Sequence, residues 1–379
     1  MHRSAALLGA LLALASPLAC GSSTSTPSSP STTGDAGAEA QTPAKPTPTC
    51  TTPTTPCGDT CVNRNTDVKN CGTCGAVCKA GQVCAAGTCA QSVAFTISSL
   101  FWGDTDRAGV PSSTAWKSYG LNIDGLTSTS SSTDLCKLAP GAPKGVQNDG
   151  TGGIDNAFGA NIVPIFLSIV GSDWGKKYND DLAAGTGLLL LDLRGFSGET
   201  DLPLLSVRVL GAADYPGKPK LDGTDRWPVL SSSFDGTGKA VVSFDAAKLA
   251  GGVLDTGPRS GSLLVPHPFV PVPIEKVRIT GTIAGTRIRN GVISGVIPFA
   301  KMEALFRDNA GRVSASLCAG EAVENVVAQL RQASDILVDG TQDPAKACDG
   351  ISIGLGFEGV GVEIGDTVKP ADPLPNPCK

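Results

Sequence analysis

The sequence predicts a mainly β protein with a few helices, in which a β-sandwich or jelly-roll-like C-terminal domain follows a small disulfide-rich module. Two observations lead to this prediction. Eight of the 13 cysteines lie between Cys50 and Cys89, in a segment with few apolar residues. Beyond residue 92, short apolar segments with an alternating pattern are separated by glycine and proline, as in antiparallel sheets. We therefore expect a module at residues 50–91 and a β-rich domain at residues 92–379.

The first residues predict export. A short basic start precedes an apolar run that is too short to span a membrane, which is the pattern of a secretory signal over residues 1–19. Residues 16–21, Ser-Pro-Leu-Ala-Cys-Gly, resemble a lipobox, although Pro17 stands where that pattern usually has leucine. The resemblance implies a lipid on Cys20 that attaches the chain to a membrane; the alternative is ordinary cleavage after Ala15. The number of cysteines favours lipidation of Cys20. Without Cys20, 12 of the 13 cysteines remain, and an even number can pair completely in disulfides.

The segment after Cys20 is rich in Ser, Thr and Pro and has almost no large apolar side chain. Such a composition cannot bury enough surface to offset the entropy of ordering the chain. We predict a disordered tether over residues 20–49, which begins at the lipidated Cys20.

The cysteines of the module are too closely spaced for a hydrophobic core. From Cys57 to Cys89 the spacing is C-x3-C-x9-C-x2-C-x3-C-x5-C-x4-C, and Cys50 makes the number even. Domains this small usually need disulfides or a metal. Zinc is the competing interpretation at Cys71-x2-Cys74, but the cluster has no histidine and follows an export signal, so disulfides are favoured. The pairing stays open. The predicted half-cystines of the whole chain are Cys50, Cys57, Cys61, Cys71, Cys74, Cys78, Cys84, Cys89, Cys136, Cys318, Cys348 and Cys378.

The run Asn70-Cys-Gly-Thr-Cys-Gly75, followed by Cys78, Gly81, Cys84, Gly87 and Cys89, resembles the stigma-specific cysteine-rich family. It is also similar to modules of exported myxobacterial lipoproteins. The resemblance covers about a tenth of the chain and implies a disulfide-bonded extracellular module, with contacts to proteins or polysaccharides and no enzymatic activity. It predicts an outer-membrane lipoprotein or a cell-surface protein.

Strand patterns dominate the C-terminal domain. Alternating or continuous apolar residues predict strands at 92–98, 187–193, 204–210, 240–244 and 261–265. The clearest stretch is 275–298, where alternation is interrupted by Asn290-Gly291, for which we predict a type I′ hairpin turn. Residues 351–364 return to strand, with a change of phase at Glu358-Gly359 that predicts a β-bulge at Gly359.

Two helices are expected between these strands. Pro298 stands at a predicted first helical position, and residues 321–337 carry an apolar stripe that ends before Gly340. Two of the four cysteines in this domain bracket the second helix. We expect Cys318 to pair with Cys348 and Cys136 to pair with Cys378, while the two other pairings stay open.

Two apparent catalytic motifs do not fit their structural context. Residues 354–359 match G-x-G-x-x-G, but β alternation runs through the glycines, whereas a dinucleotide site needs a helix after them. His267 is the only histidine beyond the signal, and it lies between prolines in a chain without a G-x-S-x-G elbow. We expect neither a nucleotide site nor a Ser-His-Asp triad.

One loop has the composition of a calcium site. In residues 148–156, NDGTGGIDN, oxygen ligands alternate with glycines, which resembles the loops of calcium-binding extracellular repeats. We predict no other cofactor, and Ca²⁺ on Asp149, Asp155 and Asn156 as the one candidate. The alternative is a turn rich in Asp, Asn and Gly that leads into the apolar residues after it.

Charge and aromatic content limit the partners. A net charge of −5 without a basic run makes nucleic acid a poor partner. Trp102 and Trp116 flank a polar loop that leaves room for a sugar-binding site. The sequence favours a lipid-anchored surface protein that binds a glycan or a protein and is not an enzyme. The alternative is a secreted hydrolase that acts on polysaccharide through two carboxylates.

Overall fold

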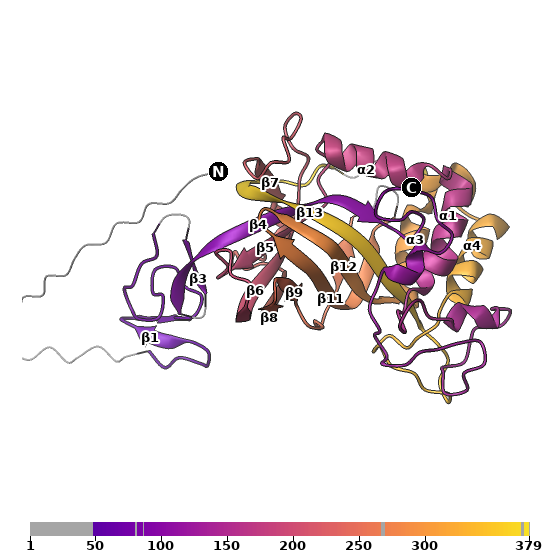
Figure 1. Cartoon of the computed structure of the whole chain (residues 1–379), viewed down its shortest axis with the longest axis horizontal. Coiled ribbons are helices and arrows are strands. Elements are labelled where there is room, and N and C mark those ends of the chain that lie inside the picture. The colour runs from indigo at the N-terminus through magenta and orange to yellow at the C-terminus, as the bar shows by residue number, and fades with distance from the viewer. Residues whose placement is uncertain (1–47, 80–81, 86, 267–269, 373–374, 379) are drawn as a thin grey trace, which may run out of the picture. The chain divides into compact units, whose positions relative to one another are not determined.

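Eight antiparallel strands close into a barrel. The computed structural model describes residues 48–79, 82–85, 87–266, 270–372 and 375–378. Within them the barrel follows the order β4–β5–β6–β8–β9–β11–β12–β13, and β13 pairs back with β4 (Figure 1). Its strands are β4 (Thr88–Phe101), β5 (Leu189–Arg194), β6 (Leu202–Gly211), β8 (Val242–Ala250), β9 (Val253–Asp255), β11 (Val272–Ala284), β12 (Arg287–Pro298) and β13 (Gly350–Val368).

The prediction of a mainly β fold is confirmed, but the sandwich or jelly roll is wrong. The barrel closes through β13, which has 19 residues and pairs with both β12 and β4. Its pairing with β4 is irregular between Glu358 and Gly359, where the sequence predicts a bulge. A bulge increases the local bend and twist of a strand, which helps a sheet to close on itself.

In the described parts of the chain, five short strands lie outside the barrel path. β3 (Gln82–Ala85) pairs with the start of β4, so the predicted boundary between residues 91 and 92 falls inside β4. β7 (Arg226–Leu230) pairs in parallel with the end of β13, and β10 (Leu263–Val265) pairs with β11. β1 (Thr55–Cys57) and β2 (Thr60–Val62) form a separate hairpin in the cysteine-rich segment.

Apolar side chains fill the barrel. Alternate residues of the strands, such as Ile279 and Leu355, are fully buried in one large cluster. Leu190 and Leu210 point the other way, into a smaller cluster with Trp227 of β7. β5 is therefore buried on both faces, which explains why the segment 187–193 is continuously apolar instead of alternating.

The predicted hairpin turn at Asn290-Gly291 is wrong. β11 and β12 are joined by Gly285 and Thr286, because Ala284 lies opposite Arg287. Asn290 instead has a left-handed backbone (φ 52°) within β12, where the register shifts against both neighbouring strands. The Asn-Gly pair therefore forms a bulge, a second structure that needs the same backbone conformation.

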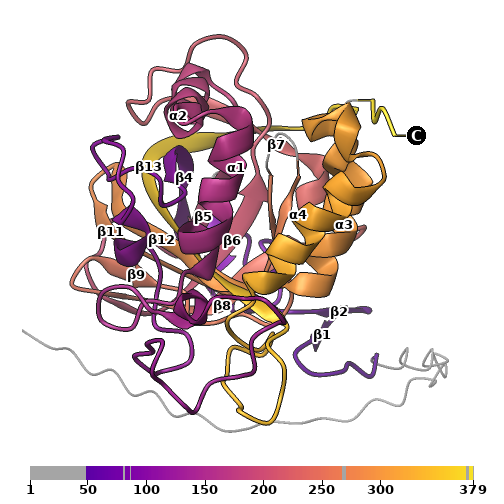
Figure 2. The same ribbon diagram turned by 90° about the vertical axis from the view of Figure 1, so that its right-hand side faces the viewer.

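Four α-helices occur among the described residues. α3 (Phe299–Val313) and α4 (Glu321–Gln332) were predicted; α4 ends before Leu337, because Asp335 and Ile336 pair with Gly350 at the start of β13. α1 (Val163–Val170) and α2 (Trp174–Ala184) were not predicted. Helices α1, α3 and α4 lie across one end of the barrel (Figure 2).

Candidate functional site

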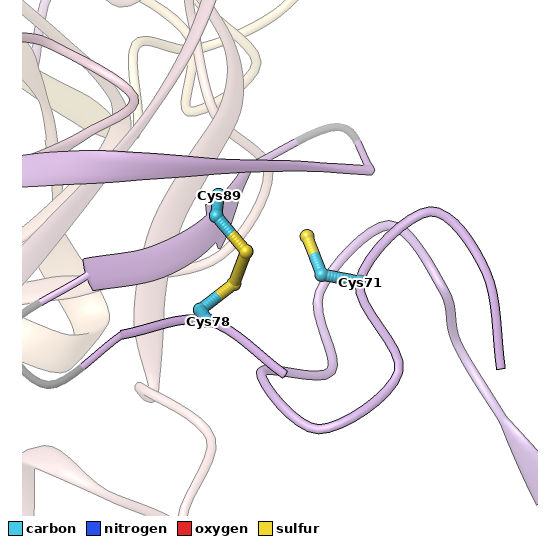
Figure 3. A group of neighbouring side chains, drawn as sticks. All are labelled: Cys71, Cys78 and Cys89. Carbon is cyan, nitrogen blue, oxygen red and sulfur yellow. A yellow bond between two sulfur atoms is a disulfide. The ribbon is translucent and has the colours of Figure 1, made fainter. Parts of the chain in front are cut away.

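The cysteine-rich segment is held by four disulfides: Cys50–Cys61, Cys57–Cys74, Cys71–Cys84 and Cys78–Cys89. The sulfur of Cys71 lies beside the Cys78–Cys89 disulfide, with the three sulfurs within 4.8 Å of one another (Figure 3). This is the only group of three possible metal-ligating side chains that comes so close in the described part of the chain. Its sulfurs are paired, as the disulfide interpretation predicted.

Two further disulfides hold the barrel domain, and their predicted pairing is wrong. Cys136 pairs with Cys348, and Cys318 pairs with Cys378. The first links two loops whose backbones also bond to each other: the N–H of Lys137 donates to the carbonyl of Lys346, and the N–H of Cys348 donates to the carbonyl of Lys137. The second fits against α3 only because residue 311 is glycine: a Cβ there would lie 2.1 Å from the Cys378 sulfur.

The predicted calcium loop lies beside a group of buried and half-buried carboxylates. Asp155 is only 2% exposed and accepts a hydrogen bond from the backbone of Ile123 at 2.5 Å. It also shares a side-chain hydrogen bond with Asp149, which accepts the backbone N–H of Ser128. Asp124 and Asp335 add two nearby negative charges, and the sequence did not associate Asp335 with this loop.

Burial, together with repulsion from neighbouring carboxylates, raises the pKa values of Asp149, Asp155 and Asp335. Desolvation, and then the charge of Asp124, raise the pKa of Asp155 to about 8. Burial raises the pKa of Asp335 to about 7, against two hydrogen bonds that it accepts from Ser352. The pKa of Asp149 is also raised, mainly by burial. A proton on Asp155 or Asp335 reduces the repulsion within this group.

Asn156, the third predicted ligand, is used by the fold itself. Its amide nitrogen donates to the backbone carbonyls of Trp116, Tyr119 and Gly354, and its oxygen accepts the N–H of Gly159 and Gly354. These bonds tie a loop, β13 and the start of the α1 segment together. Calcium on Asp149 and Asp155 stays a prediction, whereas Asn156 has no amide atom left without a protein partner.

A second candidate site is an apolar cavity at the helix-covered end of the barrel. It has a volume of about 90 Å³ and lies between α1, α3, α4, the end of β4 and the region that begins β11. Seventeen of the described residues line it, and these are apolar or aromatic except Gln329: Trp102, Phe158, Ile162, Val163, Ile165, Phe166, Ile169, Trp174, Val270, Val272, Met302, Phe306, Val313, Leu317, Val326, Gln329 and Leu330.

Aromatic contacts connect α1 to the barrel beside this cavity. The ring of Phe166 meets Trp174 edge-on, with centroids 4.9 Å apart. Trp174 contacts Trp102 at 5.5 Å and stacks on Tyr178 at 5.2 Å. Trp102 is therefore 2% exposed and belongs to the cavity wall instead of a surface platform, whereas Trp116 is half-buried. No local pattern predicts the cavity, because its walls come from segments far apart in the chain.

The remaining predicted motifs lie as follows. Residues 354–359 are in the middle of β13, as the β alternation predicted, and no helix follows them. Gly354 and Gly356 make room for Tyr119: added Cβ atoms would lie 2.2 Å from its carbonyl oxygen and 2.7 Å from its ring. Cys20 and His267 lie outside the described residues.

Comparison with known proteins concerns the cysteine-rich segment. Residues 22–92 match the Stigma-specific STIG1-like protein family, in agreement with the cysteine pattern. The match does not extend into the rest of the barrel domain. Neither the curated proteins nor the solved structures gave a match to this chain. Over the described residues, no helix combines the length and apolar character that crossing a membrane requires.

Proposed function

We propose that the protein is exported and acts at the cell surface as a non-enzymatic binding protein, held at the outer membrane by a lipid on Cys20. The STIG1-like match and the six disulfides support export, since structural disulfides persist mainly in oxidising compartments. The lipobox-like sequence before Cys20 supports the anchor.

The ligand site that we propose is the apolar cavity of the barrel domain. The single observation that carries this proposal is its lining: 16 of 17 side chains are apolar or aromatic, and the last is an amide. The described part of this lining removes apolar surface from water and offers no acid, base or nucleophile to a substrate. It is suited to binding and not to catalysis.

The other predicted ligands have less support. A glycan platform needs aromatic faces that a sugar can reach; of the predicted pair, Trp102 is 2% exposed and only Trp116 is half-buried. A polysaccharide hydrolase needs two accessible carboxylates, and the clustered Asp155 and Asp335 are 2% and 5% exposed. A protein ligand on the outer surface stays a prediction.

Native mass spectrometry tests the cavity. The protein is purified from its own membrane fraction under mild conditions, beside the variants Val326→Phe and Ala328→Phe. Val326 is half-buried and lines the cavity, whereas Ala328 is exposed on the same helix. We expect a bound small molecule on the wild type and on Ala328→Phe but not on Val326→Phe. Equal occupancy of all three would place the ligand elsewhere.

The anchor is tested separately by Cys20→Ala. We expect the wild type in the membrane fraction with an acylated N-terminus, and the variant in the soluble exported fraction. A wild type with an unmodified Cys20 would refute the anchor and would favour a freely secreted protein.

A further inference from the structure

We propose that the cavity receives the end of a hydrocarbon chain, and that α1 is the lid that admits it. This inference rests on the binding function proposed above and names its ligand class. The chain would lie between α1 on one side and α3 and α4 on the other, with its polar head at Gln329.

The size of the cavity selects among apolar ligands. At about 90 Å³ it is smaller than the roughly 150 Å³ apolar cavity that holds benzene in another protein. A rigid ring would therefore have to push the walls apart. The methyl end of a flexible chain is narrower and can occupy the same space a few carbon atoms at a time. An apolar cavity of this kind also excludes water, so no water has to be displaced from strong hydrogen bonds.

The mouth of the cavity continues in an exposed apolar surface. Ile169 lines the cavity and is nevertheless 49% exposed, and Ile165, Val313 and Val326 are half-buried. Gln329 is exposed beside them and is the one amide among the described lining side chains, whose other hydrogen-bond donors are the indoles of Trp102 and Trp174. An apolar interior with a single amide at its rim suits a ligand with a long apolar part and a small polar end.

The backbone on either side of α1 allows that helix to move. A π-helical turn, Phe158–Ile162, precedes it, and the N–H of Val163 bonds to Phe158 five residues back. Such turns are wider and less stable than α-helical ones and often occur at functional sites. Gly171 ends α1 with φ 104°, a conformation that favours glycine. Phe158 and Ile162 of the turn also line the cavity, so a change of the turn changes the cavity.

Binding of neutral alkanols of increasing length tests this inference on the full mature chain. Titration calorimetry and tryptophan fluorescence are measured with butanol to decanol, because Trp102 and Trp174 line the cavity. We expect the affinity to rise about fourfold for each added methylene until the chain fills the cavity, from about 0.8 kcal/mol per buried methylene. Val326→Phe should lower the affinity at least tenfold, and Ala328→Phe should leave it unchanged.

One further variant and one further ligand distinguish the ways in which this proposal can fail. Val313→Phe fills the cavity from α3 and replaces Val326→Phe if that variant does not fold. A different result is that benzyl alcohol binds, that Val326→Phe prevents this binding, and that alkanols do not bind. The hydrocarbon chain is then refuted as the ligand, and the cavity is still a binding site. If alkanols bind the wild type and both filled variants equally, the cavity is not their site. If neither alkanols nor a co-purified ligand bind the folded wild type, the proposed function fails as well.

Discussion

Replacement of Asp155 by asparagine should stabilise the protein at alkaline pH. The pKa of Asp155 is raised to about 8 in the folded state from an ordinary value of 3.8. Between these values the folded state keeps a proton that the unfolded state has lost. Stability therefore decreases as the pH rises through this window, which is opposite to the effect of a salt-bridged carboxylate. With about 1.4 kcal/mol per pH unit, the loss between pH 5 and pH 8 is on the order of 4 kcal/mol.

The asparagine has the shape of the protonated acid. Its oxygen can accept the hydrogen bond from Ile123, and its amide can donate to Asp149 as the carboxyl proton does. Asp155→Asn should thus leave the free energy of unfolding almost unchanged at pH 5 and raise it by a few kcal/mol at pH 8. Urea unfolding followed by tryptophan fluorescence, with the disulfides intact, measures both values. Asp235→Asn is the control: this carboxylate is exposed, bonds to Thr237 and has a lowered pKa, so no gain at pH 8 is expected.

Addition of calcium to the same unfolding experiment provides a second test. If Asp149 and Asp155 bind Ca²⁺, millimolar calcium should stabilise the wild type at pH 8 but not Asp155→Asn. Equal destabilisation by Asp155→Asn at pH 5 and pH 8 would refute the reasoning, since it would mean that Asp155 is ionised at both pH values.

Other predictions follow from single contacts. Removal of the Cys136–Cys348 disulfide by serine at both positions should lower the free energy of unfolding by up to about 5 kcal/mol, because the bond joins residues 212 positions apart; a loss below about 1 kcal/mol in chemical denaturation would contradict this. Gly354→Ala should lower the free energy of unfolding by more than about 2 kcal/mol, because the Cβ of the alanine would lie 2.2 Å from the carbonyl oxygen of Tyr119. Nucleotides should not raise the melting temperature of the wild type, and such a rise would restore the dinucleotide hypothesis.

Local patterns in the sequence predict most of the strands but not how they are assembled. Alternation locates β4, β11 and β13, and even the irregularity at Gly359. The closure of the sheet depends on the pairing of β13 with β4, which are about 250 residues apart, and no local signal encodes it. For the same reason the sequence could identify the cysteines of the barrel domain but not their partners.

Competing local signals explain the errors within the elements. Asn-Gly is a strong hairpin signal, yet Gly285-Thr286 forms the turn and Asn290 forms the bulge. α1 has the sequence VPIFLSIV, in which apolar residues stand on nearly all sides, so no helical period is visible. An apolar run of this length fits a buried strand equally well, and only its tertiary position makes it a helix.

The sequence predicts a candidate site only where its residues lie close together along the chain. Asp149 and Asp155 lie in one loop of distinctive composition, and the sequence brings them together. Asp335 comes from a segment 180 positions further along the chain, and its charge contributes to raising the pKa of Asp155 only because the fold buries both. The cavity is entirely non-local, since its walls extend from Trp102 to Leu330.

The two ends of the segment that carries α1 have different structural roles, and this difference bears on how a ligand can enter. Asn156 fixes the beginning of the segment through four hydrogen bonds to backbone atoms of a distant loop and of β13, and a fifth to Gly159 within the segment itself. Toward the other end, the helix holds to its neighbours through apolar and aromatic contacts such as Phe166 on Trp174, and it ends at Gly171. Apolar contacts are not directional and can form again in a new position, whereas the bonds of Asn156 cannot be shifted without loss. A hydrocarbon chain would therefore enter by moving the Gly171 end of α1 outward, with the Asn156 end as the pivot.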